Sequence, residues 1–211
     1  MSFKLVIFDL DGTLVDSSLD VIDCFKYAFE QEGLQVPPED EIKSTIGYPL
    51  DEVLGKYGDA ERMHAAFLKK AKEIMGNKTI LLPGARETLA KIRDKNIDIA
   101  IATTKIRQNT RRIVRLLGIE NYIGELSGAD DVDNVKPAPD ALLRLLNICK
   151  VDKDEAIMVG DTINDIIAAR NAGVKCAAIL GGFDPVEIVE ESGADWIFDD
   201  IRKVVEVVCN E

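Results

Sequence analysis

From Leu82 onward, short runs of mostly apolar residues alternate with helical segments of about ten residues. Strands that are apolar on both faces are typical of a parallel sheet covered by helices on both sides. Their alternation with helices indicates β-α-β units. We expect strands at 97–103, 122–126, 156–160, 176–180 and 196–198, and helices at 85–94, 106–117, 140–149, 164–171 and 185–192. With a further apolar run at 5–8, these segments predict an α/β fold built on a doubly wound parallel sheet.

Residues 16–81 have a different texture, without a convincing strand. Four amphipathic helices are expected there, at 19–33, 37–47, 50–58 and 59–76. An all-helical segment between the first strand and the remaining α/β pattern indicates an insertion. We therefore predict a core of residues 1–15 and 82–211 that carries a four-helix cap of residues 16–81, with hinges near Asp16 and Leu82.

Two aspartates, Asp9 and Asp11, end the first apolar run in the stretch FDLDGT. A carboxylate at the end of a buried strand costs several kcal/mol to desolvate unless it is paired or bound to a metal. Ligands of open parallel sheets bind at the carboxyl ends of the strands. The polar residues expected to meet at that edge are Asp9, Asp11, Thr103, Thr104, Lys105, Lys136, Asp161 and Asp165.

These side chains predict a site for phosphoryl transfer. Four carboxylates at one edge repel one another unless a cation lies among them. Hard oxygen ligands that leave room for water and phosphate suit Mg²⁺, so Mg²⁺ is the expected cofactor. Lysines and hydroxyls suit the oxygens of a phosphoryl group.

Composition excludes several classes of partner. The 211 residues carry a net charge of −12, which repels nucleic-acid backbones and anionic membranes. No apolar run approaches the length of a transmembrane helix, and Asp9 comes too early for a signal peptide. The four cysteines are far apart, as expected of free thiols in a reducing compartment. We expect a cytoplasmic monomer or homodimer that acts on a small phosphorylated metabolite.

Four motifs together resemble the haloacid dehalogenase superfamily of aspartate-nucleophile phosphatases. They are DLDGTLVDS, the TTK after the second strand of the core, KPAPD and GDTINDIIAARNAG, in that order along nearly the whole chain. The helical insertion after the first motif resembles the members that carry a cap there, and the general pattern is most similar to phosphoglycolate phosphatases. The resemblance implies a Rossmann-like core. One departure is Thr104, which stands where the family commonly has asparagine.

The resemblance also implies roles for the core residues. Asp9 would be the nucleophile that forms an aspartyl-phosphate, and Asp11 the general acid and then the general base. Thr103 and Lys136 would hold phosphoryl oxygens. Asp9, Asp161 and the backbone carbonyl of Asp11 would bind Mg²⁺, which Asp165 would support directly or through water.

The remaining candidates are weighed against ordinary structural roles. A cap loop with Ser44, Thr45, Gly47 and Tyr48 is a candidate substrate loop, and Thr104 a candidate substrate contact. Lys105 and a basic set of Arg107, Arg111, Arg112 and Arg115 are expected to form a solvated helix face without chemistry. His64, the only histidine, is expected to be a packed or surface residue.

The leading function is Mg²⁺-dependent hydrolysis of phosphoglycolate. A sugar-phosphate phosphatase, an inorganic pyrophosphatase and a β-phosphoglucomutase-like enzyme remain open, because all would use the same core residues. A non-enzymatic protein that binds phosphate ligands is the alternative of another class. It is disfavoured because binding alone needs no nucleophile together with an acid. A dehalogenase is disfavoured because it has no use for Asp11 or for a metal.

Overall fold

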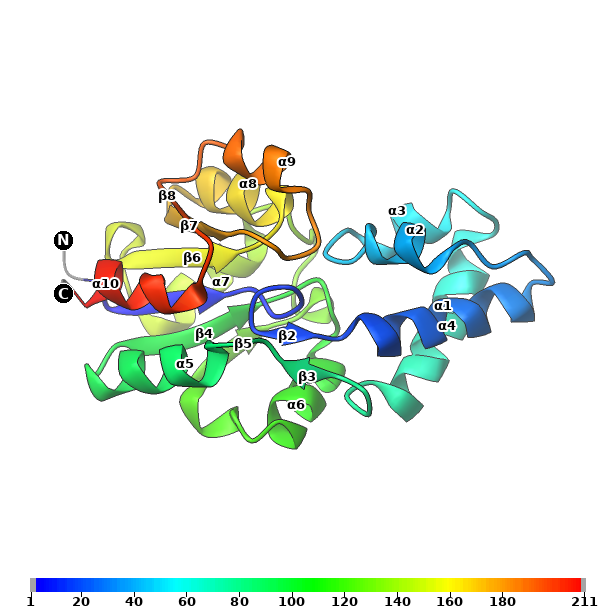
Figure 1. Cartoon of the computed structure of the whole chain (residues 1–211), viewed down its shortest axis with the longest axis horizontal. Helices are drawn as coiled ribbons and strands as arrows, with labels where there is room; N and C mark the ends of the chain where they lie inside the picture. The colour runs from blue at the N-terminus through cyan, green and yellow to red at the C-terminus, as the bar shows by residue number, and fades with distance from the viewer. Residues whose placement is uncertain (1–2, 210–211) are drawn as a thin grey trace.

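A six-stranded parallel sheet forms the centre of the core (Figure 1). The computed structural model describes residues 3–209. The strands lie in the order β5-β4-β1-β6-β7-β8, and every neighbouring pair is parallel. Their bounds are β1 Leu5–Phe8, β4 Asp98–Ala102, β5 Glu125–Ser127, β6 Ala156–Gly160, β7 Lys175–Ile179 and β8 Trp196–Phe198. The predicted doubly wound fold is confirmed.

Helices cover both faces of this sheet, as the apolar strands require. One face packs against α5 (Ala85–Asp94), α6 (Arg107–Leu116) and α10 (Val204–Val208). The other packs against α7 (Asp140–Cys149), α8 (Ile163–Ala172) and α9 (Val186–Glu190). Alternate residues of β1 divide between the two cores, with Val6 and Phe8 on the first side and Leu5 and Ile7 on the second. The predicted ranges of α5, α7, β6 and β8 are confirmed to the residue.

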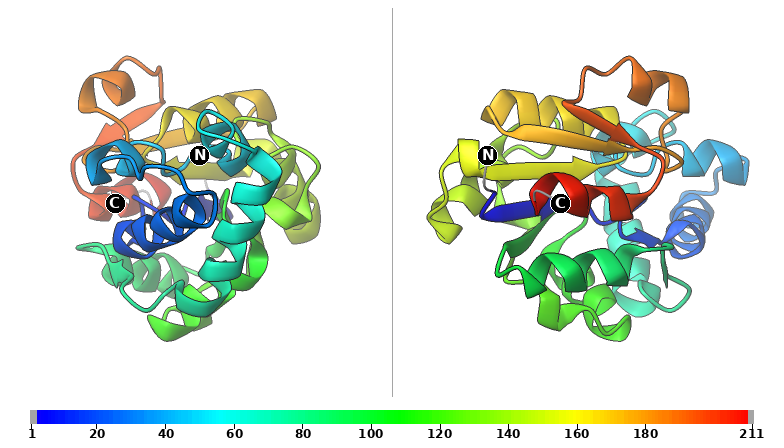
Figure 2. Two further views of the ribbon diagram at one scale, coloured as in Figure 1. Left: turned by 90° about the vertical axis from the view of Figure 1, so that its right-hand side faces the viewer. Right: turned by 60° about the vertical axis from the view of Figure 1, so that its left-hand side comes forward.

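The insertion holds four helices, as predicted. They are α1 Ser18–Gln31, α2 Glu39–Lys43, α3 Leu50–Leu54 and α4 Ala60–Ile74. The long pair α1 and α4 pack through aromatic contacts such as Phe25 against Phe67, with ring centroids 5.5 Å apart. Figure 2 shows these helices lying across one end of the core. The division into a core and a cap of residues 16–81 stays our interpretation of this layout.

The expectation of no strand between Val15 and Leu81 is wrong at both ends of that stretch. β2 (Val15–Asp16) and β3 (Ile80–Leu81) form a small antiparallel ribbon where the chain leaves and re-enters the core. Strands of two residues are too short to produce a periodic pattern. Buried Asp20 reinforces the junction, since it accepts hydrogen bonds from Gly76 N (3.0 Å) and Thr79 Oγ1 (2.6 Å), which lie near the C-terminal end of the inserted segment.

No element is expected after Phe198 from the sequence, but α10 is a helix there. Its five residues VVEVV have a composition typical of strands, and packing on α5 decides the outcome. Within residues 3–209, none of the helices has the length and apolar character that crossing a bilayer demands.

Candidate active site

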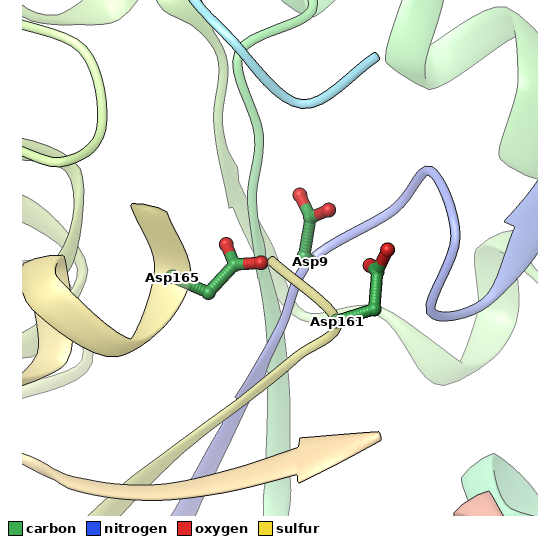
Figure 3. Close-up of side chains that lie close together, drawn as sticks. All are labelled: Asp9, Asp161 and Asp165. Atoms are coloured by element: carbon green, nitrogen blue, oxygen red, sulfur yellow. The ribbon is translucent and has the colours of Figure 1, made fainter. Parts of the chain in front are cut away.

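Three neighbouring strands deliver the polar residues to one edge of the sheet. β4, β1 and β6 are adjacent, and Thr103, Asp9 and Asp161 follow their carboxyl ends. All three residues are buried. Figure 3 shows Asp9 and Asp161 beside Asp165, which comes from the first turn of α8. The expected meeting of the carboxylates of Asp9, Asp161 and Asp165 is therefore observed.

Lys136 links two of the three carboxylates. Its Nζ donates to Asp9 Oδ1 at 2.7 Å and to Asp165 Oδ1 at 2.6 Å, and only 2% of its surface is exposed. The other oxygen of Asp165 accepts from the backbone N–H (3.0 Å) and hydroxyl (2.8 Å) of Thr162. Both oxygens of Asp165 are thus occupied by protein donors, whereas no donor among residues 3–209 meets the second oxygen of Asp9.

Asp161 is fixed by the chain around it. Its Oδ1 accepts from Thr13 Oγ1 at 2.7 Å, and its Oδ2 accepts from the backbone N–H of Phe183 at 2.9 Å. Glycines make this approach possible, because a Cβ atom at Gly12 or Gly182 would lie 2.1 Å from that same Oδ2. Gly12 also has a φ of +86°, which side chains rarely adopt. Gly12 and Thr13 of the first motif therefore position the carboxylate of Asp161.

Among the described residues, the ammonium of Lys136 is the single positive charge beside a group of three carboxylates, two of which it contacts. This excess of negative charge shifts the pKa values of the group. The pKa of Asp9 rises to about 7, because burial and the nearby carboxylates outweigh the effect of Lys136. The pKa of Asp161 is also well above its ordinary value, first through burial and then through Asp9 and Asp165. Burial opposes the charged form of Lys136, but Asp165 and Asp9 outweigh it and raise the pKa of that lysine.

The donor set fits a hard divalent cation. Asp9, Asp161 and Asp165 have carboxylate oxygens within 4.8 Å of one another, although those of Asp165 already accept hydrogen bonds from Lys136 and Thr162. Oxygen ligands of this kind suit Mg²⁺, whose charge would offset the excess of carboxylates. The side chain of Asp11 is not part of this group, and the expected ligation through its backbone carbonyl stays a prediction.

Asp11 faces a different partner set at the base of the cap. Its Oδ1 accepts a short hydrogen bond from the hydroxyl of Ser17, and its Oδ2 lies 3.2 Å from Lys105 Nζ. The expectation that Lys105 forms a solvated face is wrong, since its side chain is only 10% exposed. Lys105 precedes α6 rather than belonging to it, and the cap covers it.

The basic residues of α6 are only partly solvated. Arg111 and Arg115 are exposed, as expected. Arg107 is partly buried, with its Nε 2.8 Å from Asp131. Arg112 donates to the backbone carbonyl of Lys72 in the cap at 2.7 Å. The expectation of a fully solvated face is therefore wrong for these two residues, which the cap and the loop after β5 partly cover.

A cavity of about 460 Å³ lies between the cap and this edge of the core. Of the candidate substrate residues, Thr45, Gly47, Tyr48 and Thr104 line it. Ser44 does not, since it is exposed and its hydroxyl donates to the backbone carbonyl of Glu41 at 2.8 Å.

Three further features of the cavity wall were not predicted. Buried Asn109 places an amide on the wall that Thr104 also lines. His64 also lines the cavity, beside Asp51. The hydroxyl of Tyr48 donates to Asp184 in the core at 3.1 Å, so this residue also ties the cap to the core. Only a cap folded onto the core brings these residues together.

A haloacid dehalogenase-like hydrolase model matches residues 6–179. The chain belongs to that family. Pyrophosphatase PpaX of Halalkalibacterium halodurans is 30% identical, over 99% of this chain and 98% of that protein. Phosphoglycolate phosphatase of Pasteurella multocida is 29% identical, over 98% of each.

The structure of a predicted phosphoglycolate phosphatase of Haemophilus somnus superposes with a TM-score of 0.88, at 26% identity over 98% of each chain. The haloacid dehalogenase resemblance and the fold are confirmed. This chain is therefore an enzyme of the hydrolase class, within a family whose curated relatives carry phosphatase names.

Proposed function

We propose that this hydrolase removes phosphate from a small phosphate monoester, in a Mg²⁺-dependent reaction that passes through an aspartyl-phosphate on Asp9. The observation that carries the proposal is the placement of Asp9. It lies at the end of β1, paired with buried Lys136 at 2.7 Å, and one oxygen remains outside any hydrogen bond from residues 3–209. Asp11 lies two residues further on, against the cavity.

In the first half-reaction, the free oxygen of Asp9 attacks phosphorus, and the bond to the leaving oxygen breaks. The leaving oxygen takes its proton from Asp11. In the second half-reaction, water attacks the phosphorus of the aspartyl-phosphate and gives a proton to Asp11. The bond between phosphorus and Asp9 breaks, which releases inorganic phosphate and restores both residues.

The other residues orient Asp9 and the phosphoryl group and offset their negative charge. Lys136 donates to Asp9 and lies where it can meet phosphoryl oxygens, and Thr103 offers a hydroxyl on the same edge. When bound between Asp9, Asp161 and the backbone carbonyl of Asp11, a divalent cation would reduce the repulsion between carboxylate and phosphoryl oxygens. Asp165 holds Lys136 and Thr162 in place.

Phosphoglycolate is the leading substrate, supported by the relatives that carry that name. Inorganic pyrophosphate is the second candidate, because the Halalkalibacterium relative at 30% identity is named a pyrophosphatase. The net charge of −12 supports a small metabolite rather than a nucleic acid or a membrane as partner. A cytoplasmic location and a monomeric or homodimeric state are part of the same proposal.

The test is a kinetic comparison of wild type with Asp9→Asn on a panel of phosphate esters and pyrophosphate with Mg²⁺. We expect kcat to fall at least about a hundredfold, the loss of roughly 3 kcal/mol of transition-state stabilisation. In rapid-quench experiments, labelled phosphate should remain on wild type and not on the variant. Asp94→Asn, at the exposed end of α5, is the matched control. Retention of more than about one per cent of kcat by Asp9→Asn would remove Asp9 as the nucleophile.

A further inference from the structure

The wall of the cavity includes a largely buried cation. Lys105 lies in the loop between β4 and α6, with a side chain only 10% exposed. Desolvating an ammonium group is unfavourable unless strong acceptors surround it. A lysine in such a place is therefore expected to serve the site.

The ammonium of Lys105 is under-used by the protein. It has three donors, and within residues 3–209 it meets one strong acceptor, Asp11 Oδ2, at 3.2 Å. Its other partner is the sulfur of Met75 at 3.7 Å, and thioethers are weak acceptors. Asp11 does not depend on Lys105 for its position, because Ser17 holds its other oxygen. Lys105 therefore retains hydrogen-bonding capacity for a group in the cavity.

The charges of the cavity wall make Lys105 distinctive. Aspartates supply most of the charged lining, with Asp11, Asp51, Asp130 and Asp133. Among the described residues that line the cavity, the basic groups are Lys105 and His64. His64 contacts Asp51 through Nδ1, which leaves one further ring nitrogen, whereas the ammonium of Lys105 has three donors. Lys105 is thus the cation best placed to receive an anion.

We propose that Lys105 is a specificity-determining residue that binds a second anionic group, carried by the leaving group of the substrate. This inference rests on the proposed function, because it takes Asp11 as the group that protonates the leaving oxygen. Because Lys105 Nζ lies 3.2 Å from Asp11 Oδ2, a group two or three bonds beyond the leaving oxygen would come within reach of it. The substrate class is then a phosphate ester or anhydride whose leaving group carries its own carboxylate or phosphate.

The test compares two substrates that differ in one group. Phosphoglycolate has a carboxylate where 2-hydroxyethyl phosphate has a hydroxymethyl group. We expect wild type to favour phosphoglycolate by at least about tenfold in kcat/KM, a comparison that needs no variant. Lys105→Gln should lower kcat/KM for phosphoglycolate by about 10- to 100-fold, the range for one charge-assisted hydrogen bond. The value for 2-hydroxyethyl phosphate should change by less than about threefold.

Two control variants separate this role from others. Lys91→Gln removes an exposed lysine of α5 that pairs with Glu87, and it should leave both substrates unaffected. His64→Gln should preserve the preference for phosphoglycolate. If kcat/KM for phosphoglycolate instead falls selectively in His64→Gln and not in Lys105→Gln, His64 binds the anion and the proposal is overturned.

The remaining outcomes are also decisive. Equal losses on both substrates in Lys105→Gln would reduce Lys105 to a positioning residue for Asp11 and overturn the proposal. So would a wild type that shows no preference while hydrolysing both esters, a result that leaves the phosphatase function intact. A wild type inactive on both esters, on pyrophosphate and on p-nitrophenyl phosphate would overturn the proposed function and this inference together.

Discussion

Replacing Lys136 by methionine should destabilise the protein, quite apart from any effect on turnover. The lysine is 2% exposed and lies 2.7 Å from Asp9 and 2.6 Å from Asp165. Lys136→Met keeps most of the side-chain volume but leaves two buried carboxylates without their shared cation. Breaking a buried ion pair by removing one partner costs about 3–5 kcal/mol. For a chain of this size, each kcal/mol shifts Tm by about 2–4 °C, so we expect a loss of roughly 6–20 °C.

The loss of Tm in Lys136→Met should increase with pH. The folded-state pKa of Asp9 is raised to about 7 from an ordinary value near 4. The native state therefore holds a proton that the unfolded state has already released, and its stability falls as pH rises through that window. Without Lys136 the pKa of Asp9 rises further. The deficit in Tm should therefore be larger at pH 8 than at pH 5, where Asp9 is protonated and only Asp165 has lost its partner.

Differential scanning fluorimetry at the two pH values measures this directly, with and without Mg²⁺. A divalent cation bound among the carboxylates should recover part of the lost stability, because it replaces some of the missing positive charge. Lys91→Met, which removes an exposed lysine on α5, controls for net charge. A deficit below about 2 °C at pH 8, or one that grows on acidification, would refute this account of the buried pair.

Three further predictions concern metal and cap. Asp161→Ala should raise the Mg²⁺ concentration for half-maximal activity at least about tenfold, as measured by metal titration; an unchanged titration would contradict the assigned ligand. Activity should disappear in excess chelator and return with Mg²⁺, while Ca²⁺ should inhibit because its looser coordination shell misplaces the attacking oxygen; full activity after extensive dialysis against chelator would exclude the metal. Thr45→Ala and Tyr48→Ala should raise KM for phosphoglycolate more than for p-nitrophenyl phosphate, and equal changes in steady-state assays would place leaving-group recognition elsewhere.

The location of the site at the carboxyl edge of the sheet was predictable, because the order of the strands was not needed to find it. Any parallel arrangement brings the residues after Phe8, Ala102 and Gly160 to the same side. The chemical types at those positions, carboxylate and hydroxyl, then limited the site to a few reactions. Lys136 was found by its motif instead, since it is the first residue of KPAPD.

Residues whose role depends on distant segments were not predictable. Asp20 looks like an ordinary polar position of an amphipathic helix, but its partners lie 56 to 59 residues away. Lys105 looks like the first of a series of basic helix residues, and only the cap above it makes it a buried cation. Tyr48 was placed in the right loop, yet its hydrogen bond to Asp184 spans 136 residues. Periodicity carries no information on such contacts.

The antiparallel ribbon of β2 and β3 limits how the cap can move. Two independent linkers would let a domain shift and tilt in several directions. Here the two crossings are paired, Val15 with Leu81 and Asp16 with Ile80, and Leu82 N donates to Leu14 O just beyond them at 3.0 Å. We therefore expect the ribbon to turn as one unit and to restrict any motion of the cap mainly to rotation about it. We expect such a rotation to bring Tyr48 back to Asp184 each time the cap closes.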